Sequence, residues 1–98
     1  MKKTRVEEKR NLIGQRVREA RLKCMPPVSQ DALTGRLARK KITLDQTAIS
    51  RIENQTRYVM DYEAAAIAQA LKVSVAWLFG EKELSPTFSS KKRIGKSL

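Results

Sequence analysis

The stretch that decides the fold is DQTAISRIEN, residues 45–54. Asp45 is typical of a helix N-cap, because its carboxylate accepts hydrogen bonds from the free amides of the first turn and favours the positive end of the helix dipole. One edge of the predicted helix, 46–54, is apolar and consists of Ala48, Ile49 and Ile52. The opposite face consists of polar residues at the spacing i, i+1, i+4, i+5 and i+8: Gln46, Thr47, Ser50, Arg51 and Asn54. We therefore predict a helix that buries one edge and exposes a hydrogen-bonding face without acidic residues.

Two helices are predicted on the N-terminal side of this segment. The first has an apolar stripe at i, i+4, i+7 and i+11, which consists of Ile13, Val17, Ala20 and Cys24. It should end at residues 25–27, Met-Pro-Pro, because a residue that precedes proline is driven out of the α region. Ser29 is expected to cap the second helix, which buries Leu33 and Leu37 and ends near Lys40.

Two more helices are predicted on the C-terminal side. Asp61 is expected to cap the first of them, whose apolar residues repeat at i, i+3, i+4 and i+7 as Ala64, Ile67, Ala68 and Leu71. Ser74 is expected to cap a short last helix that carries Trp77, and Gly80 is a stop signal. Strand-like alternation is lacking throughout, so the predicted fold class is all-α, with five helices.

The chain length suits one domain. We predict a folded domain over residues 12–80. Residues 1–11 are expected to be a basic extension or the start of the first helix. Residues 81–98 are polar and basic and lack periodicity, so we expect a disordered tail.

The charge balance points to a polyanionic partner. The sequence has 21 Lys plus Arg and 10 Asp plus Glu, which gives a net charge of +11. Nucleic acid and an anionic membrane surface are the two partners that this excess favours, while the alternative is that the charge only confers solubility. RNA is less favoured than DNA, because aromatic residues make up only 5% of the chain and form no basic stacking surface.

Other chemistry is hard to place on this chain. It has one cysteine, Cys24, and no histidine, so we expect no Cys/His metal site, no imidazole base and no cofactor, and we see no catalytic constellation. A single cysteine also fits a reducing cytoplasm. No stretch approaches the roughly 18 apolar residues that span a bilayer, and acidic residues follow the basic start where a signal peptide would be apolar.

The chain resembles the lambda repressor/Cro-like helix-turn-helix family, also called the XRE family, over 13–80. The resemblance rests on four motifs: IGQRVR at 13–18, SQDAL at 29–33, QTAISRIEN at 46–54 and AQALKVSVAWL at 68–78. It implies a compact five-helix DNA-binding fold in which the 46–54 helix enters the major groove, a channel wide enough for one helix. The chain lacks the turn glycine usual in the 39–45 segment, and Lys72 replaces the glycine expected after the fourth helix.

The resemblance also implies roles for individual residues. The base-reading positions match Gln46, Thr47, Ser50 and Arg51. The phosphate-contacting positions match Gln30, Asn54 and Arg57, and Lys41 belongs to a basic cluster that would add nonspecific affinity. Arg21 and Glu53 match a partly buried ion pair that ties the first helix to the recognition helix.

Each role has a plainer alternative. Gln30 can be an ordinary first-turn residue, and Arg51, Arg57 and Lys41 can be solvated charges. Small hydroxyl residues such as Thr47 and Ser50 are common on exposed helix faces.

We expect a cytoplasmic transcriptional regulator that binds an inverted-repeat operator in double-stranded DNA as a homodimer. An alternative from another class is a protein-interaction module of the same fold, such as an antitoxin or an adaptor with a toxin or regulatory partner. An enzyme is not expected.

Overall fold

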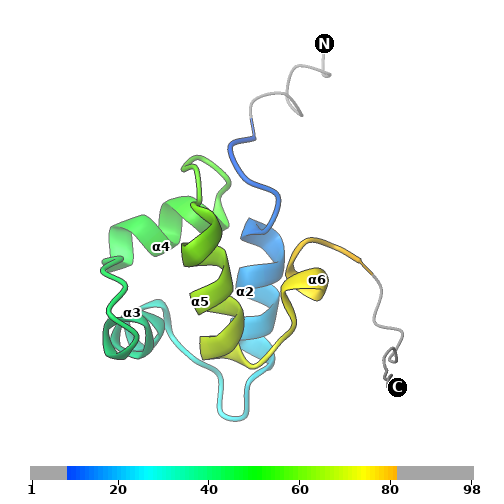
Figure 1. Ribbon diagram of the computed structural model, residues 1–98. Helices are drawn as coiled ribbons and strands as arrows, with labels where there is room; N and C mark the ends of the chain where they lie inside the picture. Colours follow the sequence, from blue (N-terminus) through cyan, green and yellow to red (C-terminus); the bar gives the residue numbers. More distant parts are fainter. Residues whose placement is uncertain (1–8, 82–98) are drawn as a thin grey trace, which may run out of the picture.

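The computed structural model describes residues 9–81, and within that range it is all-helical (Figure 1). Its helices are α2 (Gly14–Lys23), α3 (Gln30–Arg39), α4 (Gln46–Glu53), α5 (Asp61–Leu71) and α6 (Val75–Leu78). The predicted all-α class with five helices is confirmed for this part of the chain. The predicted N-terminal extension and C-terminal tail lie outside the described residues, except for 9–11 and Glu81.

Three of the predicted N-caps are confirmed. Ser29 Oγ accepts from the backbone N–H of Ala32 at 2.9 Å, and Asp45 Oδ1 accepts from that of Ala48 at 2.8 Å. Ser74 Oγ accepts from the N–H of Trp77 at 3.0 Å. Each cap satisfies an amide that has no partner inside its helix, which is why these residues set the helix starts.

The predicted cap at Asp61 is wrong by one residue. Met60 is the N-cap of α5, and Asp61 is the first residue of the helix. Glu63 reaches back instead, and its carboxylate accepts from the Met60 N–H at 2.9 Å. The acidic first turn still favours the positive end of the helix dipole. Glu63 therefore supplies the half of a capping box in which the side chain at the third helical position bonds the N-cap residue's own N–H.

Three helices end on a non-glycine residue in the left-handed conformation. Lys41, Gln55 and Lys72 follow α3, α4 and α5 with φ of 66°, 65° and 61°. The chain after each closes with a pair of hydrogen bonds; after α3 the N–H of Ile42 donates to Leu37 and that of Lys41 donates to Ala38. This is the Schellman arrangement, which usually has glycine at the left-handed position. The turn after α3 thus forms with Lys41 at the left-handed position, where glycine is usual.

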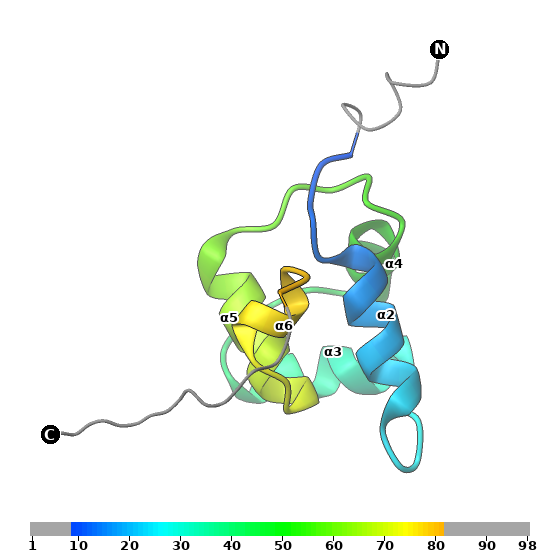
Figure 2. The same ribbon diagram turned by 90° about the vertical axis from the view of Figure 1, so that its right-hand side faces the viewer.

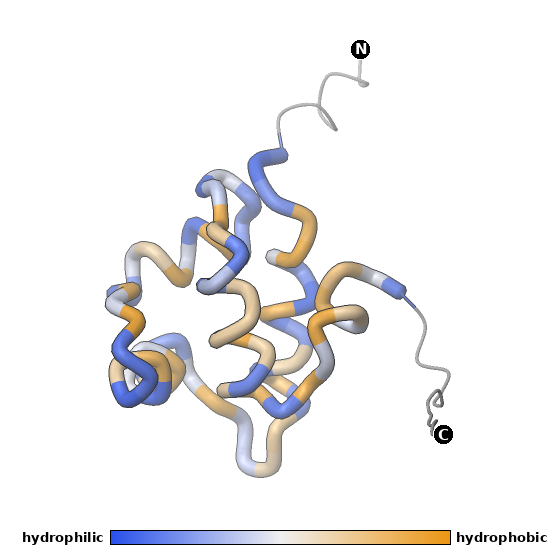
Figure 3. Tube along the Cα trace, viewed as in Figure 1, coloured by the Kyte–Doolittle hydropathy of each residue, from blue (hydrophilic) through white to orange (hydrophobic). Residues whose placement is uncertain are grey.

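The helix α5 packs against three other helices. These are α2, α3 and α6, while α4 packs against α2 and α3 (Figures 1 and 2). The largest side chains that are fully buried come from all five helices and their flanks: Ile13, Val17, Leu33, Leu37, Ile49, Ile52, Ile67 and Leu78. The hydropathy trace shows α5 as largely apolar and the turn after α3 as strongly hydrophilic (Figure 3). The predicted apolar stripes thus form one core.

The position of α4 is set by close contact with the start of α2. A Cβ on Gly14 would overlap the carbonyl oxygen of Ile52 and would lie 3.0 Å from that of Glu53. Only glycine lets the two backbones approach this closely. The helix α4 ends at Glu53, one residue before its predicted end, and Asn54 is its C-cap.

Candidate functional site

The exposed face of α4 forms a shallow hollow with the start of α3. Its volume is about 330 Å³, and it is lined by Gln30, Gln46, Thr47, Ser50 and Arg51. The four residues predicted to read bases therefore lie together, with a predicted phosphate-contacting residue beside them. The opposite edge of α4 is anchored in the core, where Ile49 and Ile52 have no exposed surface. The burial of that edge keeps the polar face turned outward.

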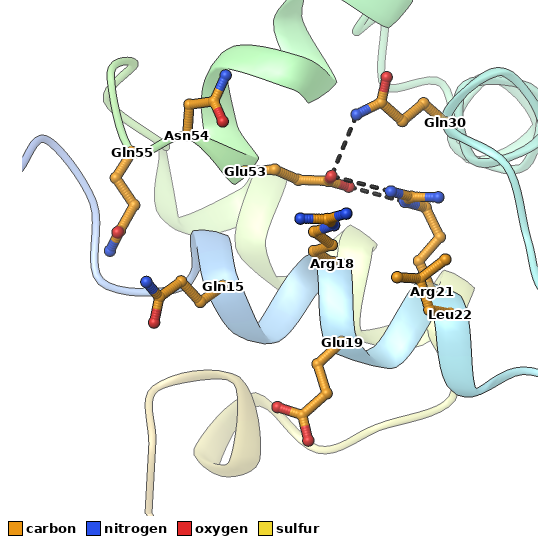
Figure 4. Close-up of a pocket in the computed structure, with 9 residues that line it drawn as sticks. All are labelled: Gln15, Arg18, Glu19, Arg21, Leu22, Gln30, Glu53, Asn54 and Gln55. Atoms are coloured by element: carbon orange, nitrogen blue, oxygen red, sulfur yellow. Dashed lines mark hydrogen bonds and ion pairs between the residues drawn. The ribbon is translucent and has the colours of Figure 1, made fainter.

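A buried ion pair connects α2 to the end of α4. Arg21 Nε lies 2.8 Å from Glu53 Oε2, and Arg21 Nη2 lies 3.0 Å from Oε1, so the guanidinium binds the carboxylate through two parallel bonds (Figure 4). Both side chains are less than a tenth exposed. The hydrogen bond to Glu53 raises the pKa of Arg21, against the lowering effect of burial. The structure thus brings together the two residues that the resemblance paired.

Gln30 extends this connection to α3. Its Nε2 donates to Glu53 Oε1 at 3.1 Å, and its Oε1 accepts a longer bond of 3.4 Å from Gln46 Nε2. A chain of polar contacts therefore runs from α2 through Glu53 and Gln30 to the first residue of α4. Because Gln30 is held from both sides, its side chain has a defined place at the edge of the hollow.

The other predicted phosphate-contacting residues lie outside the hollow. Lys41 is exposed in the turn between α3 and α4, and Asn54 is exposed at the end of α4. Arg57 is partly buried and already has partners: its Nη1 lies 3.0 Å from Glu63 Oε1 and donates to the carbonyl of Tyr58 at 2.8 Å. The structure thus gives Arg57 a role in holding the loop between α4 and α5.

Asn11 supports the site although the sequence interpretation placed it in the extension. Its Nδ2 donates to the carbonyls of Ile52 and Arg57 at 3.1 and 2.8 Å, and its Oδ1 accepts from the N–H of Gly14 at 2.8 Å. The same side chain therefore caps the start of α2 and binds the end of α4. An asparagine three residues before a helix was a local signal of a cap. Its bonds to α4 had no local signal.

The hollow offers hydrogen-bond chemistry. It combines two amides, two hydroxyls and one guanidinium, which can bond the edges of bases, and it has no acidic residue in its lining. Among residues 9–81, no three Asp, Glu or Cys side chains gather as metal ligands.

Comparisons with known proteins do not assign this chain to a family. No protein-family model, curated protein or solved structure matches it. In the described part of the chain, no helix has the length and apolar character needed to cross a membrane.

Proposed function

We propose that this protein is a sequence-specific regulator of transcription that binds double-stranded DNA with α4 in the major groove, in a lambda repressor-like arrangement of its helices. One observation carries the proposal. Four polar residues of α4 line a single exposed hollow together with Gln30, while Ile49 and Ile52 on the opposite edge of the same helix are fully buried. A short helix presented in this way suits a groove that admits one helix.

The chemistry of the hollow suggests how bases are read. Gln46 can bond the N6 and N7 atoms of adenine, and Arg51 can fork onto the O6 and N7 atoms of guanine. Thr47 and Ser50 offer hydroxyls to either base type. The Arg21–Glu53–Gln30 contacts support this reading because they connect α4 to α2 and α3. The net charge of +11 adds attraction to any duplex.

A homodimer on an inverted repeat is part of the proposal. A two-fold protein matches a two-fold operator, and each α4 then enters one half-site. The exposed apolar side chains of Leu12, Met60 and Phe79 border one hollow of about 270 Å³ and offer a surface for self-association. The proposed setting is the cytoplasm.

The experiment is selection of bound duplexes from a random pool, followed by binding measurements on the selected duplex. We expect an enriched site with two-fold symmetry. The variant Arg51→Ala should lose discrimination at one base step in each half-site, with a cost of about 1–3 kcal/mol, and should bind random duplex nearly as well as the parent protein.

Arg39→Ala is a matched control, because Arg39 is exposed at the end of α3 and does not line the hollow. Arg39→Ala should weaken binding to the selected duplex and to random duplex by the same factor. If the pool yields no enriched site, the proposal is wrong and the protein-interaction alternative is favoured. If Arg51→Ala and Arg39→Ala act alike on both duplexes, base reading by α4 is wrong.

A further inference from the structure

A second and larger groove lies next to the α4 hollow. It runs between α2 and the end of α4 and has a volume of about 740 Å³ (Figure 4). Its lining includes Gln15, Arg18 and Glu19 from α2, Asn54 from the end of α4, and the Arg21–Glu53 pair. Gln30 belongs to this groove and to the hollow, so the two depressions meet at that residue. A partner that fills the hollow and extends beyond Gln30 would therefore also lie over the groove.

Most of the charges in the groove are neutralised within the protein. Arg21 and Glu53 bind each other, and Glu19 pairs with Lys23 at 3.1 Å. Glu19 also points away from α4 (Figure 4). Arg18 is exposed and, within residues 9–81, has no ion pair or hydrogen bond from its side chain. Among the described residues that line the groove, Arg18 is therefore the charged side chain without an ion pair.

Two uncharged side chains accompany Arg18. Gln15 lies one turn before it on α2, and Asn54 is the C-cap of α4. In the described part of the chain, neither side-chain amide forms a hydrogen bond, so both keep their donors for a ligand. A guanidinium suits a phosphate because it binds phosphate oxygens through paired bonds, and the amides of Gln15 and Asn54 in the same lining can add further donors.

We infer that this groove binds a backbone phosphate of the DNA strand that borders the major groove occupied by α4, and that Arg18 is the main ligand. The inference rests on the proposed function and adds to it a residue that holds the duplex without reading its sequence. The ligand is a phosphodiester because the groove adjoins the base-reading hollow and because Arg18, the charged lining residue without an ion pair among residues 9–81, is positive. Phosphate contacts of this kind fix the register of a protein on DNA.

The test compares Arg18→Gln with Arg16→Gln. Both variants lose one positive charge from α2. Arg16, however, lines neither the groove nor the hollow, and its Cζ atom lies 4.4 Å from the centroid of the Trp77 ring. Binding to the selected duplex and to a random 20-base-pair duplex is measured in NaCl from about 50 to 200 mM. Thermal unfolding of Arg18→Gln should match that of the parent protein, since Arg18 has no partner within residues 9–81.

We expect Arg18→Gln to weaken binding to both duplexes by the same factor. In a plot of the logarithm of the association constant against the logarithm of the NaCl concentration, the slope should become about 0.9 less steep. Across that salt range, the parent protein should lose about 3.5-fold more affinity than the variant. Arg18→Lys should restore the slope, because it restores the charge. Arg16→Gln should keep the parent slope.

Equal slopes of affinity against salt for Arg18→Gln and Arg16→Gln would overturn the inference. So would a loss of affinity in Arg18→Gln that is confined to the selected duplex. If Arg51→Ala still loses discrimination in that case, the proposed function stands and only the groove assignment fails. If the parent protein binds neither duplex, the proposed function fails and the inference fails with it.

Discussion

At the scale of single residues, Glu63 shows how one carboxylate organises the loop that follows α4. Burial raises its pKa, but the hydrogen bond from Arg57 and that from the backbone of Met60 outweigh this effect, so the pKa of Glu63 is lowered. A carboxyl whose pKa is lower in the folded state stabilises the fold above its ordinary pKa, and this stabilisation is lost as the pH falls through the lower, folded-state value.

The variant Glu63→Gln tests this. It should lower the free energy of unfolding by about 1.5–3 kcal/mol at pH 7, because it removes a charge that receives hydrogen bonds in a largely buried place. The unfolding curves of parent and variant in urea should converge as the pH is lowered below the ordinary range of a carboxyl. A difference that does not change with pH would contradict the role of ionisation.

Glu19→Gln is the control for Glu63→Gln. Glu19 forms an exposed pair with Lys23 one helical turn away, and such pairs contribute little. Removal of the Glu19–Lys23 pair should change the free energy of unfolding by less than about 0.5 kcal/mol.

At the scale of elements, the contact between α2 and α4 depends on a residue without a side chain. Gly14→Ala should destabilise the protein by about 1–3 kcal/mol, because the added Cβ overlaps the carbonyl of Ile52 and a backbone cannot move aside cheaply. The shift should also weaken binding to the selected duplex, since it changes the placement of α4.

Gly35→Ala provides the matched comparison for Gly14→Ala. It lies inside α3, and an added Cβ there meets nothing within 4 Å. It should stabilise the protein by about 0.5–1 kcal/mol, the usual gain of alanine over glycine within a helix. Thermal and urea unfolding of both variants measure the contrast, and equal effects of the same sign would refute the close approach.

The end of α5 offers a stabilising substitution. Lys72 has φ of 61°, a conformation that costs an L-residue about 1–2 kcal/mol. Lys72→Gly removes that cost but adds freedom to the unfolded chain, so the net gain should be about 0.5–1 kcal/mol. Lys72→Ala keeps the Cβ and should bring no gain. Urea unfolding midpoints distinguish the two, and an equal gain from both would assign the effect to the lysine charge.

Gln55 occupies the equivalent position after α4, but its side chain also donates to the carbonyl of Asn11 at 3.1 Å. A glycine there would lose that bond. Substitution by glycine is therefore expected to affect stability differently at Gln55 and at Lys72, although the two residues have the same backbone conformation.

At the scale of the whole molecule, the proposed dimer predicts a specific surface. Met60 is about half exposed beside the hollow it shares with Phe79, whereas Met25 is almost fully exposed in the loop between α2 and α3. Met60→Lys should raise the dimer dissociation constant at least tenfold, on the order of 1.4 kcal/mol, because it places a charge in an apolar contact. Sedimentation equilibrium measures this constant.

Met25→Lys should leave self-association unchanged, since Met25 does not line that hollow. Binding to the two-fold site should fall with Met60→Lys and persist with Met25→Lys. A dimer that is disrupted by Met25→Lys alone would move the interface to the other loop.

The amino-acid sequence by itself determined the helices, because their causes are local. An apolar stripe repeats every three or four residues, and a cap such as Ser29 or Asp45 bonds an amide three residues away. The polar face of α4 followed from the same spacing. For the Arg21–Glu53 pair, only a family resemblance connected residues that lie 32 positions apart.

Only the tertiary structure decided how the helices meet and which polar groups pair across them. Asn11 bonds the carbonyl of Arg57, 46 positions away, and Arg57 is held by Glu63 instead of standing free in solvent. The meeting of the groove and the hollow at Gln30 is also a product of packing. The physical reason is that such contacts form between segments that the core brings together, and local periodicity carries no information about them.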